Sequence, residues 1–330
     1  MRRMKITESR FCRRFALDTA IALAPMALAS GGALAAASAR AGALGLVGGG
    51  YGELAWTQRE YALALQQGPR ERIGCGFITW KLDEDASALD WALEHRPVAV
   101  MLSFGDPRTY AGRIARSGAA LICQVQRLEQ VAQAVEAGAT VIVAQGGEAG
   151  GHGMNGLNSR ATITLVPEIA DWLAARSPGT LLLAAGGIAD GRTLAAALVL
   201  GADGALVGSR LWATRESLAP EGAKQQAVQT TGDGTARSEV FDILRRKNWP
   251  APYDFRAIRN DLHRQWEGRI EALRADPAAA RAAYDAGVTA GDFSRAHATI
   301  GESVALVRDL PPAEEIIARM TREAQALLGD

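Results

Sequence analysis

Residues 180–209, TLLLAAGGIADGRTLAAALVLGADGALVGS, decide the fold of this chain. The stretch has a continuous apolar run at each end, 180–185 and 205–209, and between them Asp190-Gly191 leads into a helix that Gly201 ends. Continuous hydrophobicity is typical of a parallel strand covered on both faces, and glycine is a common helix stop. The stretch therefore predicts a strand, a helix and a second strand parallel to the first.

Six more apolar runs of the same kind come before it. They lie at 21–26, 43–48, 72–78, 98–104, 120–125 and 140–145. The segments between the runs mostly have helical patterns; Leu128, Val131 and Val135, for example, share one helical face. Eight strand-then-helix units predict an α/β fold, a (β/α)8 TIM barrel that binds ligands at the carboxyl ends of its strands. An open doubly wound sheet is the alternative if one strand is misassigned.

The chain changes character after Ser209, where charged residues become more frequent and no further core strand is predicted. Helices are expected from 216 to about 298. One of them, 257–275, carries apolar residues at helical spacing that we assign to packing: Ile258, Leu262, Trp266 and Ile270. We expect residues 216–300 to form an added helical lobe near the C-terminus that covers the barrel mouth as a substrate lid.

A final helix is predicted to begin after Pro311-Pro312 and to end at Leu328, because proline is favoured at the first position of a helix. We expect it to pack back on the barrel. The barrel domain is thus predicted to comprise residues 1–215 plus 301–330.

Composition excludes several classes of partner. The 330 residues include 36 basic and 36 acidic side chains, so no basic field exists to attract nucleic acid or an anionic membrane. Three widely spaced cysteines fit a reducing compartment and form neither a disulfide framework nor a metal motif. The four histidines also lack metal-ligand spacing, so no metal is predicted.

The N-terminal Arg13-Arg14, followed by an Ala-rich run, imitates a twin-arginine export signal. Asp18, Pro25 and Gly31-Gly32 interrupt that run, which is too short to span a membrane. We therefore expect a first core strand, a helix at 31–40 and a cytoplasmic protein.

Glycines and one histidine follow the predicted strand at 140–145. Residues 144–153, AQGGEAGGHG, place His152 among glycines that let a backbone approach a bulky ligand. Histidine has an ordinary pKa that suits proton transfer near neutral pH. The segment predicts a cofactor site with an acid or base beside it.

Two further glycine sites follow the last two strands, at Gly186-Gly187 and at Gly208-Ser209. In barrels, the loops after strands seven and eight commonly bind phosphate through backbone N–H groups. Met26 ends the first strand and is placed to lie against a flat ring. The Gly-rich residues 48–52 are interpreted as backbone near the ligand and not as an NAD site.

Taken together, these motifs resemble the nitronate monooxygenase family, formerly called 2-nitropropane dioxygenases, whose members are FMN-dependent TIM barrels. The matching segments are 24–26, 42–45, 145–152, 185–191, 208–210, 213–217, 301–303 and 309–312. The resemblance covers nearly the whole chain, and the segment around His152 is its most specific part.

The resemblance implies FMN as the cofactor and an alkyl nitronate or nitroalkane as the substrate. The residues implied to contact FMN are Met26, Ala27, Gln145, Gly150, Gly151, Gly186, Gly187, Gly208 and Ser209. His152 would be the catalytic base that takes the α-proton of a neutral nitroalkane, or the group that steadies an anionic nitronate. The implied reaction with O2 yields a carbonyl compound and nitrite.

The sequence departs from the family pattern at two positions. Many members carry Asn where this chain has Gly76, and some carry Lys where Gln124 stands. The histidine segment and the flavin barrel also resemble the FMN-dependent enoyl-acyl carrier protein reductases, which use NADH, and this function is kept as an alternative. A non-catalytic flavin-binding module is a third, since a fold does not determine function. The oligomeric state is left open.

Overall fold

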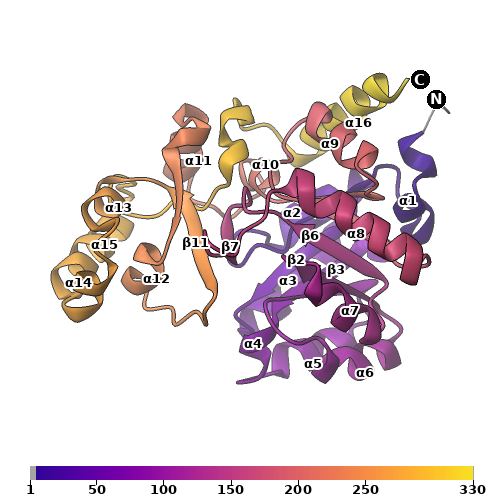
Figure 1. The fold of residues 1–330 in the computed structure, drawn as a ribbon, viewed down its shortest axis with the longest axis horizontal. Coiled ribbons are helices and arrows are strands. Elements are labelled where there is room, and N and C mark those ends of the chain that lie inside the picture. Colours follow the sequence, from indigo (N-terminus) through magenta and orange to yellow (C-terminus); the bar gives the residue numbers. More distant parts are fainter. Residues whose placement is uncertain (1–4, 330) are drawn as a thin grey trace.

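The computed structural model describes residues 5–329 as a barrel of eight parallel strands with a lobe beside its mouth (Figure 1). The strands pair in the order β1-β9-β8-β6-β5-β4-β3-β2, and a bridge between Ala22 and Leu44 closes the ring. They are β1 (Ile21–Leu23), β2 (Gly45–Gly50), β3 (Ile73–Ile78), β4 (Ala99–Ser103), β5 (Ala120–Val125), β6 (Val141–Gln145), β8 (Leu181–Ala185) and β9 (Gly204–Val207). The predicted (β/α)8 barrel and its eight strands are confirmed.

Helices surround the barrel because each connection between parallel strands must cross back over the outside of the sheet. The longer ones are α2 (Gly32–Arg40), α3 (Leu54–Gln67), α5 (Ser87–Glu94), α6 (Arg108–Ser117), α7 (Glu129–Glu136), α8 (Thr162–Arg176) and α9 (Gly191–Val199). Asp190 caps α9 by accepting a hydrogen bond from the backbone N–H of Thr193, and Gly201 adopts a φ of 100° after it. Among residues 5–329 no helix has the combined length and apolar character needed to cross a membrane.

The last outer helix comes from a distant part of the sequence. The short helix α10 (Ser209–Trp212) follows β9, and the chain then leaves the barrel to build the lobe. It returns as α16 (Ala313–Leu328), which packs on α9 and α2 through buried side chains that include Ile316 and Met320. Figure 1 shows α16 close to α1 (Arg10–Phe15), the helix that contains Arg13-Arg14. The predicted final helix is confirmed.

The lobe contains strands, which the sequence did not predict. The strands β10 (Thr235–Ser238) and β11 (Tyr253–Ile258) form an antiparallel sheet with β7 (Gly151–Met154), which follows β6 of the barrel. The lobe helices are α11 (Glu221–Gln229), α12 (Val240–Leu244), α13 (Asp261–Trp266), α14 (Ile270–Ala275) and α15 (Ala278–Ala290). The expectation of helices alone was wrong, because these strands are stabilised by pairing with a segment far away in the sequence.

The predicted helix at 257–275 is also broken into pieces. Ile258 ends β11, and Asn260 caps α13 by accepting from the backbone N–H of His263. Gly268, with a φ of 73°, then separates α13 from α14. Leu262 is nonetheless 5% exposed, so the apolar stripe does serve packing.

Candidate active site

A cavity of about 730 Å³ opens at the carboxyl ends of the barrel strands and extends under the lobe. All ten residues predicted from sequence to form the site line this cavity: Met26, Ala27, Gln145, Gly150, Gly151, His152, Gly186, Gly187, Gly208 and Ser209. They come from the ends of four barrel strands and from β7, so the fold brings distant segments together. Within residues 5–329 no group of three or more His, Cys, Asp or Glu side chains could hold a metal ion.

His152 lies on a short strand, where the sequence predicted a loop. It sits in β7 opposite Phe255 of β11, a pairing that local sequence does not reveal. The side-chain amide of Gln145 donates to the His152 carbonyl oxygen at 3.1 Å and accepts from the amide of Gln126 at 2.9 Å. His152 is therefore held from the barrel as well as from the lobe.

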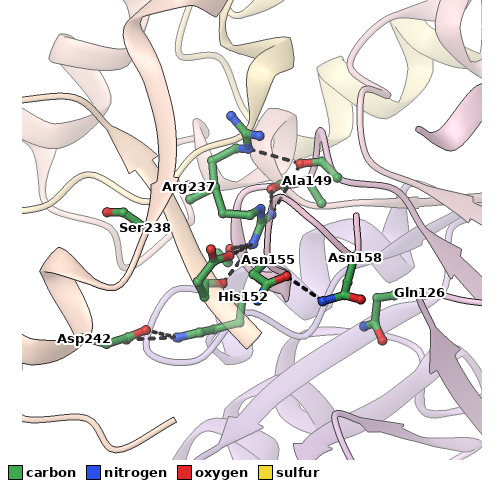
Figure 2. A network of polar contacts seen from close by, with 12 residues as sticks. Gln126, Ala149, His152, Asn155, Asn158, Arg237, Ser238 and Asp242 are labelled. Atoms are coloured by element: carbon green, nitrogen blue, oxygen red, sulfur yellow. Dashed lines mark hydrogen bonds and ion pairs between the residues drawn. The ribbon is translucent and has the colours of Figure 1, made fainter. Parts of the chain in front are cut away.

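The imidazole of His152 is paired with a carboxylate of the lobe. Its Nε2 lies 2.9 Å and 3.1 Å from the two carboxylate oxygens of Asp242, which belongs to α12 (Figure 2). Trp249 stacks on the imidazole with ring centroids 3.4 Å apart and planes inclined by 12°. The other ring nitrogen, Nδ1, has no hydrogen-bond partner among the described residues.

Burial controls the protonation of this pair. It lowers the pKa of His152 well below its ordinary value, and the charges of Arg245 and Arg237 act in the same direction. Burial also raises the pKa of Asp242 to about 7, against the opposing effect of Arg245. The imidazole is thus neutral near pH 7, as a base that accepts a proton must be.

The charge of Asp242 decides which imidazole nitrogen carries the proton. An ionised Asp242 accepts a hydrogen bond from Nε2–H, which leaves the lone pair on Nδ1. A protonated Asp242 donates to Nε2 instead, and the imidazole proton then sits on Nδ1. Neither Asp242 nor Trp249 was predicted, because they lie in a segment that was expected to be helical and carries no motif.

Arg237 of β10 holds the glycine segment in place. Its guanidinium donates to the carbonyl oxygen of Ala149 at 2.8 Å and to the backbone and side chain of Asp254 at 2.8 Å and 3.3 Å (Figure 2). The carbonyl oxygens of Gly147 and Gly151 also accept from it, at 3.4 Å and 3.3 Å. Its side chain is only 5% exposed. One buried cation therefore sets the path of the loop that leads to His152.

The cavity lining also offers free backbone donors after β8 and β9. In the described chain the N–H groups of Gly187 and Gly208 have no hydrogen-bond partner. Gly187 has a φ of 77°, and a Cβ there would have no neighbour nearer than 3.9 Å. Ser209 Oγ accepts from the N–H of Gly301 at 2.9 Å, so its own proton is available to a ligand. Unpaired donors in an open cradle suit an anion such as phosphate.

Comparison with known proteins assigns the family. A family model described as nitronate monooxygenase matches residues 70–323. The chain belongs to the nitronate monooxygenase family. It is 36% identical to nitronate monooxygenase npaC of Metarhizium robertsii over 273 residues, which cover 78% of this chain and 74% of that protein. It is 30% identical to the nitronate monooxygenase of Neurospora crassa over 339 residues, which cover 92% and 88%.

Comparison with solved structures supports the fold. The structure of FabK from Thermotoga maritima matches with a TM-score of 0.81 and 25% identity, and the match covers 97% of each chain. The sequence resemblance is therefore confirmed, and this nitronate monooxygenase family member is an oxidoreductase with a TIM-barrel fold.

The structure gives a physical reason for one departure from the family pattern. A Cβ at Gly76 would lie 2.4 Å from Cγ of Pro25, so this chain has no room for asparagine at that position. Gln124, the other departure, also lines the cavity and donates to Gln145 Oε1 at 3.2 Å. Both positions line the cavity in this family member.

A second buried histidine of the cavity was not predicted as a site residue. His297 lines the cavity, and its Nδ1 lies 2.7 Å from the hydroxyl of Tyr284 on α15. Burial lowers the pKa of His297 to about 3, so its imidazole stays neutral. Phe255 lies between the two imidazoles, with ring centroids 4.8 Å from His152 and 5.8 Å from His297. The lobe thus contributes aromatic side chains and a second neutral imidazole, that of His297, beside His152.

Proposed function

We propose that this family member is an FMN-dependent nitronate monooxygenase. It oxidises alkyl nitronates, and nitronates formed from neutral nitroalkanes, with O2 to carbonyl compounds and nitrite. The observation that carries the proposal is the position of His152, a buried neutral base in the same cavity as the unpaired N–H groups of Gly187 and Gly208. Such a cavity can hold a phosphorylated cofactor beside a base that accepts a proton from the substrate.

The residues present fit FMN. Gly187, Gly208 and Ser209 would hold its phosphate, and the backbone of Met26 and Ala27 would contact its ring. The remaining predicted FMN contacts are Gln145, Gly150, Gly151 and Gly186. Bound FMN would supply the redox chemistry, which no side chain of the cavity can provide.

The protein's own part in the reaction is proton transfer and charge stabilisation. His152 accepts the α-proton of a neutral nitroalkane at Nδ1, because Nε2 is bound to Asp242. The imidazolium formed is balanced by the Asp242 carboxylate, while Arg245, which lines the cavity, stabilises the nitronate anion. A substrate that arrives as a nitronate needs no base, and His152 can then donate a hydrogen bond to the anion from Nδ1–H, the tautomer that a protonated Asp242 favours.

Flavin spectroscopy tests the proposal. The purified protein is expected to absorb at about 370 and 450 nm, as oxidised flavins do. Anaerobic ethyl nitronate should bleach the longer-wavelength band, and admission of O2 should consume oxygen and release nitrite. Rapid bleaching by NADH with turnover of a crotonyl thioester would support the enoyl-acyl carrier protein reductase alternative. A bound flavin without any turnover would support a binding module.

Gly187→Val is expected to abolish FMN binding without unfolding the barrel. Valine disfavours a φ of 77°, and its side chain would fill the open cradle. The flavin-to-protein ratio of the purified variant is expected to fall to about a tenth or less of the wild-type ratio. Gly179→Val, at a surface turn with nothing near a Cβ, is the control and should keep its flavin. A fully flavinated Gly187→Val would place the phosphate elsewhere.

Turnover of a neutral nitroalkane is expected to rise with pH through about 7. Asp242, with its raised pKa of about 7, is protonated below that pH and then directs the imidazole proton to Nδ1. kcat/KM should fall about tenfold per pH unit on the acid side. Asp242→Asn removes the titrating group, so this acid limb should disappear and the rate at pH 8 should drop about tenfold or more.

The matched control for the pH profile is a preformed nitronate, which needs no base. For this substrate, kcat/KM of the wild-type protein should not fall below pH 7. An unchanged acid limb in Asp242→Asn would show that another group controls the protonation of His152.

A further inference from the structure

The cavity mouth carries exposed apolar side chains. Three large apolar residues are about half exposed and also line the cavity: Leu28 (55%), Leu218 (48%) and Val288 (52%). Single exposed apolar residues are ordinary on a protein surface, but a group of them at the opening of a cavity is typical of a binding site for an apolar ligand.

These residues belong to one continuous wall. The backbone N–H of Leu218 donates to the carbonyl oxygen of Ala29 at 3.1 Å, which places Leu218 beside the turn that holds Leu28. The cavity lining continues with Ala223 of α11, Val288 of α15 and Phe293 of the segment after α15. Gly222 lies so close to the ring of Phe293 that a Cβ would approach it to 2.9 Å. Helix α11 therefore packs against the segment that follows α15.

Leu28 occupies an unfavourable backbone conformation. Its φ is 61°, a left-handed value that costs a bulky side chain energy and that glycine adopts freely. The turn is held by Ser30, whose hydroxyl accepts from the N–H of Met26 at 3.1 Å and donates to the carbonyl oxygen of Ala24 at 2.7 Å. A leucine that is both strained and half exposed gains nothing from the core, which suggests that it contacts a ligand.

Two positively charged side chains of the cavity lie near His152 or its aromatic neighbours. Arg245 stacks over Phe255, the strand partner of His152, and lies 3.8 Å from Asp242. Lys247 stacks over the ring of Tyr51 at 4.2 Å, and both cations line the cavity. The cavity is therefore cationic beside the base, and at its opening the apolar residues stand next to one ion pair, Arg246–Asp285, whose charges balance.

We propose that the substrate is amphiphilic: a nitronate whose apolar alkyl chain runs from His152 to a rim subsite formed by Leu28, Leu218 and Val288. This inference rests on the proposed function, because it assigns the anionic head to a nitronate. The cations bind that head, and the rim buries the far end of the chain. Medium-chain nitronates, from hexyl to decyl, are then better substrates than ethyl nitronate.

Binding of unreactive analogues tests the subsite without turnover. Alkyl carboxylates are planar anions with two oxygens, as nitronates are, and can be titrated calorimetrically from butyrate to decanoate. Each added methylene should tighten binding about two- to fourfold, up to the ~0.8 kcal/mol expected for a fully buried CH2. The kcat/KM of the matching nitronates should rise in parallel.

Three variants and two controls locate the subsite. We expect a smaller gain in affinity per added methylene in each of three variants, Leu28→Gly, Leu218→Ser and Val288→Thr. Their loss of affinity relative to the wild type should therefore grow with the length of the alkyl chain. Leu28→Gly also suits the left-handed φ, so a folding defect cannot explain its effect. Leu327→Ser and Val199→Thr change exposed apolar residues outside the cavity lining and should leave the series unchanged.

The outcomes separate this inference from the proposed function. If the affinity for alkyl carboxylates does not change with the length of the alkyl chain, and ethyl nitronate is turned over rapidly, the subsite is overturned and the proposed function stays intact. A rising affinity series without any nitronate turnover would support an amphiphilic-anion site and remove the nitronate function. A wild-type dimer that Leu218→Ser converts to monomer, measured by light scattering, would mean that a second copy covers the rim and would overturn the proposal.

Discussion

Replacing His152 by Asn is expected to slow the turnover of a neutral nitroalkane by about 10²- to 10⁴-fold, the usual contribution of a general base. Asn can still accept a hydrogen bond but cannot accept the α-proton. Turnover of the corresponding nitronate should fall far less, because that substrate has already lost its proton. Stopped-flow reduction of the flavin with each substrate in turn measures both effects.

The ratio of nitroalkane turnover to nitronate turnover distinguishes loss of the base from general damage to the protein. A variant that had only lost flavin or stability would lose both activities equally. His95→Asn is a suitable control, because His95 stacks on Trp91 at the end of α5 and does not line the cavity. If His152→Asn retained nitroalkane turnover with its flavin bound, His152 would not be the base.

Arg237→Met is expected to cost about 3–5 kcal/mol of unfolding free energy, as removal of one partner of a buried ion pair commonly does. Methionine approximates the length of the arginine stem but donates no hydrogen bonds. Asp254, 11% exposed, would lose its cation, and the carbonyl oxygens of Ala149 and Gly151 would lose their donor. Urea titration followed by circular dichroism measures the change.

The loop should also become disordered near His152, so flavin affinity and turnover are expected to fall with stability. Arg264→Met is the matched control, since Arg264 and its partner Asp261 are 60% and 75% exposed. Exposed pairs contribute little, so this control should stay within about 1 kcal/mol of the wild type. A stable Arg237→Met with normal turnover would show that the loop holds its path without the cation.

The barrel could be predicted because its strands are buried on both faces. β8, for instance, is buried at every position, so burial alone requires a continuous apolar run there. Glycine positions were equally informative. Gly48 of β2 would clash with the carbonyl oxygen of Met26 at 2.3 Å if it carried a Cβ, which explains the glycine at that position.

The lobe could not be predicted in the same way. β10 and β11 are only four and six residues long, β10 (Thr-Ala-Arg-Ser) shows no strict alternation of polar and apolar residues, and β11 pairs with β7 so that Arg256 lies opposite Gly151. No local pattern specifies such a partner. Asp242 reaches His152 only through this sheet and the adjoining α12, so the carboxylate could not be recognised before the lobe was placed. The cofactor roles of the cavity glycines remain predictions.

The position of α16 has a consequence for the order in which the molecule assembles during synthesis. A polypeptide leaves the ribosome from its N-terminus, and domains tend to fold as they emerge. All eight barrel strands are made before the lobe, but the helix that covers α9 and α2 is made after it. The nascent barrel therefore waits with an uncovered apolar seam while the lobe is translated. In the finished molecule that seam is covered by Ile316, Ile317 and Met320. Before α16 is made, a chaperone or another unfinished chain would bind there first.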